Sequence, residues 1–251
     1  MYKVGKYSDK LREHFQDKRI NALAAKKMIE KPEAKVGAAP EGRFTAIDGN
    51  CNSIDPYKAI CPIFRQQDDK SLKLIGTGFY ISNNGIFATA AHVLKDVISE
   101  NGEQERPIVV FDFSKKNQYV IRNLLRGIIN NETDVGVGMC RGMEHNITKK
   151  KLLNKVLTIS KSSPKIGDMV FTYAYPNTVH IKTNIEEIHL NPLYFEGEIT
   201  DSFPNGRDSV FLPSKCYQTN ITIHGGASGG PVFNSKGHVV GINSTGFDGC
   251  N

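Results

Sequence analysis

Short β-favouring runs separated by turn signals fill most of the chain after about Ile54, and they constrain the fold more than any other feature. Among them are KLIGTGFYIS, IFATAAHV, RPIVVFDF, DMVFTYAY and NPLYFEGEIT. Asn84-Gly85 separates two of these runs and predicts a hairpin, and Ser235-Lys236-Gly237 predicts another. Many short strands with few helical patterns predict an all-β sandwich or barrel.

The first 54 residues have a different character. Ser8 is a candidate helix cap, and an imperfect apolar stripe continues to about Glu30, so we expect an N-terminal α-helical extension over residues 1–32. Residues 33–54 are rich in Pro, Ala, Gly and charge, which predicts a linker. The helix either packs its stripe on the main domain or docks on a partner or a membrane surface.

Composition narrows the function classes. The 251 residues carry a net charge of +6, but no nucleic-acid-binding motif concentrates that charge, so no nucleic-acid partner is expected. No apolar run is long enough for a transmembrane segment, and no secretory signal is visible. The five cysteines are scattered and form no CxxC pair, so neither a disulfide framework nor a zinc site is expected. These features predict a reduced, intracellular, cytoplasmic protein.

Three motifs carry possible chemistry: ATAAHV with His92, ETDVGVG with Asp134, and GGASGGPV with Ser228. A serine hydroxyl becomes a nucleophile when a base removes its proton, and histidine does this near neutral pH. A buried carboxylate fixes the tautomer of that histidine. Gly226 can adopt backbone angles closed to other residues, which lets its N–H and that of Ser228 point at one developing oxyanion.

Other interpretations of these residues stay open at this level. His92 can be a structural histidine, Asp134 and Ser228 can be turn residues, and Asp112 is a rival carboxylate. His224 is either a substrate contact or a surface histidine. The residues that would have to bind a metal have no standard ligand spacing, so no metal site is expected; they are His180, His189 and Cys216.

The same motifs resemble the chymotrypsin-like serine proteases, and most closely the bacterial Deg-like (HtrA-type) trypsin-like peptidases. GTGFYISNNGIFATAAHV is similar to the strands that lead to the histidine in that family, and GDMVFTYAYP and FEGEIT resemble two strands of the second barrel. QTNITIHGGASGGPVFNSKGHVVGIN is similar to the nucleophile region. The resemblance covers roughly residues 57–246 and leaves residues 1–54 without a counterpart.

This resemblance implies two packed antiparallel six-stranded β-barrels in a protease domain over residues 55–251. The first barrel would span about 55–145 and the second about 160–251. The sequence stops before the strand that normally completes the second barrel, so we expect this last strand to be missing here, with a longer chain, another segment or a second chain supplying it.

The resemblance also implies roles. His92 would be the general base, Asp134 its orienting carboxylate and Ser228 the nucleophile, with the Gly226 and Ser228 amides as the oxyanion hole. No cofactor is implied. The implied substrate-binding residues are Thr222, Ile223, Asn243, Ser244, Thr245 and Gly246.

Two departures from the family pattern are informative. Digestive relatives place Asp before the serine, where it receives a charged new N-terminus after zymogen cleavage; here that residue is Ala227, and no matching cleavage site occurs. No acidic residue lies at the implied pocket base, which favours a small or medium apolar residue over Lys or Arg at the cleavage point.

The predicted function is therefore that of a serine endopeptidase acting on protein or peptide substrates through a Ser-His-Asp triad and an acyl-enzyme. An extended substrate would pair with a strand edge beside the site. The alternative is a protease-fold binding or regulatory module that is inactive until a partner or a missing C-terminal segment completes it.

Overall fold

The computed structural model describes residues 33–36, 44–99, 102, 103, 105, 108–115, 118–142, 144, 151, 153–176, 178–182, 186–210 and 212–245. They belong to one compact unit, Pro32–Asn251. The helix predicted over residues 1–32, and any docking through it, lies outside the described residues and stays a prediction.

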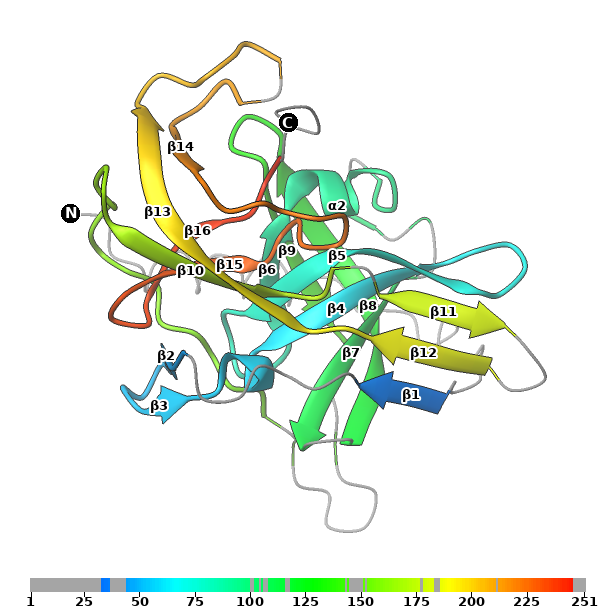
Figure 1. The fold of residues 1–251 in the computed structure, drawn as a ribbon. Helices are drawn as coiled ribbons and strands as arrows, with labels where there is room; N and C mark the ends of the chain where they lie inside the picture. Colours follow the sequence, from blue (N-terminus) through cyan, green and yellow to red (C-terminus); the bar gives the residue numbers. More distant parts are fainter. Residues whose placement is uncertain are drawn as a thin grey trace. The chain divides into compact units, whose positions relative to one another are not determined.

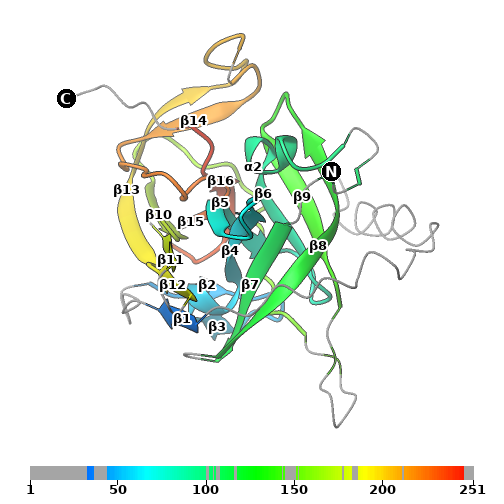
Figure 2. The same ribbon diagram turned by 90° about the vertical axis from the view of Figure 1, so that its right-hand side faces the viewer.

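Six antiparallel strands close into a barrel, drawn in cyan and green in Figures 1 and 2. A short 3₁₀ helix, η2 (Pro56–Lys58), precedes the barrel, and α2 (Ala91–Lys95) follows its third strand. In barrel order the strands are β4 (Ile60–Gln66), β5 (Leu72–Tyr80), β6 (Ile86–Ala90), β9 (Val135–Cys140), β8 (Gln118–Asn130) and β7 (Ile108–Lys115). Closure gives every strand a neighbour on both sides, although β5 pairs with β6 only at Phe79 and Tyr80.

The predicted hairpin at Asn84-Gly85 joins β5 to β6, with Phe79 paired to Ala88. Gly85 has a φ of 95°, a left-handed conformation that glycine adopts at little cost. The sequence pattern is confirmed here because the turn residues and the flanking apolar strands agree.

Apolar side chains fill the barrel interior and include two cysteines, Cys61 and Cys140. Burial raises the pKa of both thiols, that of Cys140 to about 12. Thiols held protonated in this way are unreactive, so these cysteines serve as small apolar packing residues. The other members of the buried cluster are Ile63, Tyr80, Phe87, Ala90, Val93, Leu94, Val97, Ile98, Ile108, Val110 and Leu124.

The strands after the barrel form an open five-stranded sheet, seen beside the barrel in Figure 2. Among the described residues its edge strands are not paired with each other, so the expected second six-stranded barrel is corrected to a half-barrel. The second predicted hairpin is present as the last two strands, with Gly237 at a φ of 77°. In sheet order the strands are β14 (Cys216–Thr219), β13 (Leu193–Phe203), β10 (Met169–Ala174), β15 (Pro231–Asn234) and β16 (Val239–Ile242).

The described part of the predicted linker packs on the rest of the domain. Phe44 stacks on Phe171 at 4.8 Å between ring centroids, and its ring centroid lies 5.1 Å from that of Phe233.

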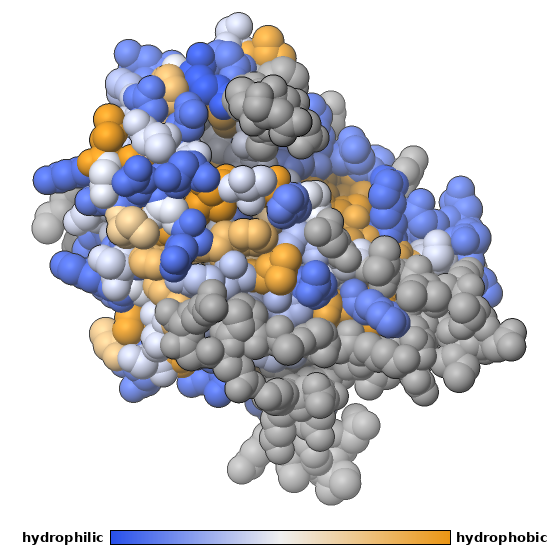
Figure 3. Space-filling model, viewed as in Figure 1, coloured by the Kyte–Doolittle hydropathy of each residue, from blue (hydrophilic) through white to orange (hydrophobic). Residues whose placement is uncertain are grey.

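Figure 3 shows the face of the molecule seen in Figure 1, with apolar residues near its middle, around β10 and β13, and many hydrophilic residues toward its left and upper rim. The short strands are β1 (Glu33–Val36), parallel to β12 (Glu186–Leu190), which pairs with β11 (Val179–Lys182), and β2 (Ala46–Ile47), paired with β3 (Ser53–Ile54).

The packing inside the barrel makes a direct prediction at Gly138, which faces Phe87 across β6 and β9. A Cβ at Gly138 would come within 2.3 Å of the Phe87 ring. We expect Gly138→Ala to lower the free energy of unfolding by about 1–3 kcal/mol, because the buried ring must shift. Gly142→Ala is the control, since nothing lies within 4 Å of its added Cβ. Equal urea midpoints for the two variants would contradict this packing.

Candidate active site

Strand register brings His92 and Asp134 together. His92 is the second residue of α2, which directly follows β6, and Asp134 directly precedes β9. Because Ala90 pairs with Val135, the residues that follow one strand and precede the other are adjacent. The His92 ring Nδ1 lies 2.9 Å from Asp134 Oδ2, and the His92 backbone N–H donates to Oδ1 at 3.0 Å.

Asp134 lies at a left-handed φ of 48°, which Asp tolerates better than most residues. Burial raises the pKa of this carboxyl, but hydrogen bonds from the His92 ring, the Ser244 hydroxyl and the His92 backbone N–H lower it by more. The net pKa therefore lies below the usual value of 3.8. An ionised carboxylate beside Nδ1 favours the tautomer that leaves Nε2 free to accept a proton.

Ser228 lies beside this pair. Its hydroxyl donates to the Ser244 carbonyl at 3.4 Å, while the Ser244 hydroxyl donates to Asp134. Within the described part of the chain, no hydrogen bond joins the Ser228 hydroxyl to the His92 ring. Such bonds are often long or absent in free enzymes and tighten when substrate binds.

The turn before Ser228 exposes two backbone N–H groups. The Ala227 N–H donates to the His224 carbonyl at 3.0 Å, and Gly226 has a φ of 93°, as the third residue of a type II turn requires. Neither the Gly226 N–H nor the Ser228 N–H bonds to any described residue. Two unpaired donors on either side of one peptide are the arrangement an oxyanion hole needs.

Sequence reasoning missed Thr77, in the Gly-Thr-Gly of β5. Its hydroxyl donates to the Gly226 carbonyl at 2.8 Å and accepts from the Tyr175 N–H at 3.1 Å. Its backbone N–H donates to the Ser228 carbonyl at 2.8 Å. Paired glycines inside a strand indicate that another backbone approaches closely, and that was the available signal.

The residues expected to bind substrate differ in their surroundings. Thr222 and Thr245 are exposed, Ile223 and Ser244 are half-buried, and Gly246 lies outside the described residues. Asn243 is only 4% exposed. Its side-chain amide donates to Thr172 at 2.7 Å and to the Ala227 carbonyl at 3.4 Å. Asn243 therefore braces the serine loop from behind, and its side chain offers almost no surface to a substrate.

The two rival residues have other surroundings. Asp112 accepts from Arg122 at 3.2 Å and from Asn154 at 2.6 Å, inside the first barrel. His224 is exposed, with its ring 6.0 Å from that of Phe195.

In the described ranges, no three His, Cys, Asp or Glu side chains cluster as metal ligands would. No helix in those ranges is long and apolar enough to cross a membrane.

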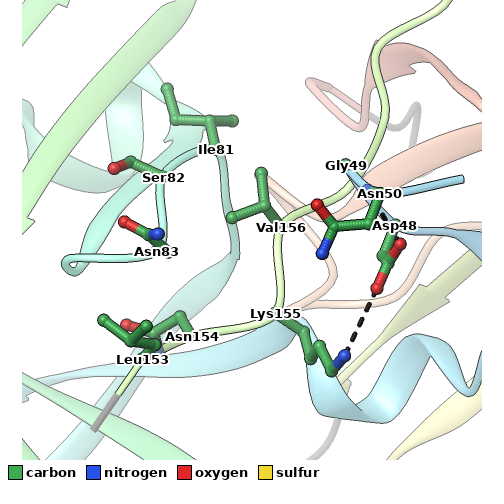
Figure 4. Close-up of a pocket in the computed structure, with 10 residues that line it drawn as sticks. All are labelled: Asp48, Gly49, Asn50, Ile81, Ser82, Asn83, Leu153, Asn154, Lys155 and Val156. Carbon is green, nitrogen blue, oxygen red and sulfur yellow. Dashed lines mark hydrogen bonds and ion pairs between the residues drawn. The ribbon is translucent and has the colours of Figure 1, made fainter. Parts of the chain in front are cut away.

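A pocket of about 450 Å³ opens at a different place, between the β2–β3 turn, the β5–β6 turn and residues 153–156. Figure 4 shows Lys155 reaching the Asp48 carboxylate at its rim, at 3.3 Å. His92, Asp134 and Ser228 are not among its lining residues, so this pocket is separate from the candidate active site.

The chain is similar to proteins of one known family. Residues 76–242 match the family model of the trypsin-like peptidase domain. The chain is 28% identical over 190 residues to a "Probable periplasmic serine endoprotease DegP-like" of Pseudomonas putida (strain GB-1), and 26% identical over 195 residues to one of Hahella chejuensis (strain KCTC 2396). These matches cover 72% and 76% of the chain but only 30% and 32% of the relatives. A solved structure of Deg5 has the same fold, with a TM-score of 0.55 at 16% identity over 75% of this chain and 80% of that one.

The relatives correct one expectation. They are named periplasmic, which contradicts the intracellular setting and the cytoplasmic location expected from the sequence. The physical reason is that unpaired cysteines do not identify a reducing compartment when, as with Cys61 and Cys140, they are buried as packing residues.

The chain spans about 30% of the length of the relatives in Pseudomonas. Because the family model matches well over half of its residues, the chain belongs to the trypsin-like peptidase family.

Proposed function

We propose that this chain is a serine endopeptidase whose nucleophile is Ser228. The observation that carries the proposal is the turn beside the serine, in which the Gly226 and Ser228 N–H groups have no partner among the described residues. A hydrogen-bonded His92–Asp134 pair next to the same serine supports it. The family match and the names of the relatives point to the same reaction.

The proposed reaction begins when the Ser228 hydroxyl turns from the Ser244 carbonyl toward His92 Nε2. The oxygen bonds to the peptide carbonyl carbon as its proton moves to Nε2, and the Gly226 and Ser228 N–H groups bind the oxyanion. His92 then protonates the departing amine, the C–N bond breaks and an acyl-enzyme forms. His92 then takes a proton from a water molecule whose oxygen bonds to the ester carbon. The bond from that carbon to Ser228 Oγ breaks, the peptide leaves as a carboxylic acid, and His92 returns the proton to Ser228.

Three further assignments belong to the same proposal. The first β unit spans about residues 55–145 and the second about residues 160–251. The substrate would contact Thr222, Ile223, Ser244 and Thr245. Because none of these residues is acidic, we propose a preference for small or medium apolar side chains at the cleavage point. We also propose a periplasmic location, because the relatives are named periplasmic. The alternative, an inactive binding module, gains no support from the comparisons.

A fluorophosphonate probe tests the nucleophile, because it phosphonylates a serine only where a base and an oxyanion hole are assembled. We expect labelling of the wild type at Ser228, located by peptide mapping, and none in Ser228→Ala, whose peptide turnover should fall by about 10⁶-fold. Ser235→Ala, at an exposed turn between β15 and β16, is the matched control and should be labelled normally. A wild type that no such probe labels would favour the inactive module.

Asp134→Asn tests the orienting carboxylate. An amide at this position can hold the His92 ring in the wrong tautomer, so we expect kcat to fall by about 10⁴-fold. Asp168→Asn is the control, because that carboxylate is exposed and accepts from the Lys165 N–H. Near-normal kcat in Asp134→Asn would assign the role to another group.

The lowered pKa of Asp134 also predicts how stability depends on pH. A carboxyl whose pKa is lower in the folded than in the unfolded state stabilises the fold above its usual pKa of 3.8, and that contribution is lost as pH falls through the folded-state pKa. We expect the difference in unfolding free energy between the wild type and Asp134→Asn to shrink between about pH 5 and pH 2. Urea unfolding across this range measures it, and a difference that stays constant would contradict the lowered pKa.

A further inference from the structure

The loop that carries Ser228 is made of peptides that rotate easily. Glycine occupies four of the six positions in Gly225–Gly230 and adopts both signs of φ at little cost. A rotation of the Gly225–Gly226 or the Ala227–Ser228 peptide would turn an oxyanion donor away from the substrate. In digestive relatives a charged residue before the serine holds the loop, but here that position is Ala227, which is 1% exposed and carries no charge.

Hydrogen bonds hold the peptides that lie between the two donors and after them. The Gly226–Ala227 peptide is bonded at both ends, because its carbonyl accepts from the Thr77 hydroxyl and its N–H donates to the His224 carbonyl at 3.0 Å. The Ser228–Gly229 peptide is also bonded at both ends. Its carbonyl accepts from the Thr77 N–H, and its N–H donates to the Asn243 carbonyl at 2.7 Å.

Thr77 therefore holds both of these carbonyls, one with its side chain and one with its backbone. The edge of β5 is available for this because β5 pairs with β6 only at Phe79 and Tyr80. Thr77 is itself fixed: its side chain is completely buried, and its carbonyl accepts from the Thr89 hydroxyl at 2.8 Å.

Two glycines make the approach of the loop to Thr77 possible. A Cβ at Gly76 would lie 2.9 Å from the Ser228 carbonyl oxygen, and one at Gly229 would lie 2.3 Å from the Thr77 carbonyl oxygen. A side chain at either glycine would therefore push β5 and the serine loop apart. Across this contact the Thr77 hydroxyl reaches Gly226 and Tyr175 at once.

We propose that Thr77 is a positioning residue for the reaction: its hydroxyl fixes the Gly226–Ala227 peptide and so keeps both oxyanion donors aimed at the substrate without a charged group. The inference rests on the proposed function of Ser228. The hydroxyl acts on the transition state through the donors and does not touch the substrate, so its loss should lower kcat and leave KM nearly unchanged.

Thr77→Val is the main test, since it keeps the shape of the side chain and removes the hydroxyl. We expect kcat and the rate of fluorophosphonate labelling to fall at least about tenfold, but by less than the roughly 10²–10³-fold cost of losing an oxyanion donor itself. Thr77→Ser keeps the hydroxyl and should stay within about threefold of the wild type. Thr158→Val is the control, because it also removes a hydroxyl bonded to a backbone carbonyl, that of Asp48, which lines the separate pocket.

The outcomes separate this inference from the proposed function. If the wild type and Thr77→Val are labelled at the same rate and share one kcat, the positioning role is wrong while the endopeptidase stands. An equal loss in Thr77→Ser and Thr77→Val, or a rise in KM alone, also overturns it. An unlabelled wild type contradicts the proposed function and this inference with it. If Thr77→Val does not fold, Thr77→Ala compared with Thr77→Ser decides between the same outcomes.

Discussion

The contact between β5 and the serine loop is the interaction on which the candidate site depends. His92 and Asp134 lie beside strands of the closed barrel, whereas Ser228 and the proposed oxyanion donors lie in the loop before β15 of the open sheet. The barrel is the support, and Thr77, on the part of β5 that does not pair with β6, bonds the loop at two carbonyls. Asn243 bonds the same loop from the side of the open sheet. The relative position of the proposed base and the proposed nucleophile therefore depends on hydrogen bonds between the closed barrel and the open sheet.

Local sequence patterns were sufficient for the parts of the fold that depend on neighbouring residues. The hairpins at Gly85 and Gly237 follow from turn residues between apolar strands, and both are present. Two other features depend on contacts distant in the chain. One is the open second sheet, whose edge strands have one partner each among the described residues; the absent last strand was predicted, but the closed six-stranded barrel was wrong. The other is the docking of Phe44 on Phe171 and Phe233, because nothing in a Pro- and Gly-rich segment shows which rings will receive an aromatic side chain.

The candidate site divides in the same way. His92 and Ser228 lie in motifs that few structural roles require, and the order of the residues with Asp134 pointed to one chemistry. Thr77 carries no chemical signal of its own, since it acts through hydrogen bonds to a residue 149 positions away. Asn243 was grouped with the substrate pocket because its neighbours are there, although its side chain faces the interior. Sequence reasoning thus identifies reacting groups more readily than the groups that hold them in place.

The central claim is that the loop presents both oxyanion donors without a charged group before the serine. A crystal structure of the chain with a peptide boronic acid tests this most directly, because the boron bonds to a serine oxygen and mimics the tetrahedral intermediate. We expect the boron to be bonded to Ser228 Oγ, with one boronate oxygen accepting from the Gly226 and Ser228 N–H groups. We also expect the Thr77 hydroxyl to remain bonded to the Gly226 carbonyl. A bound boronate with either donor turned away, or with the Thr77 bond broken, would contradict it.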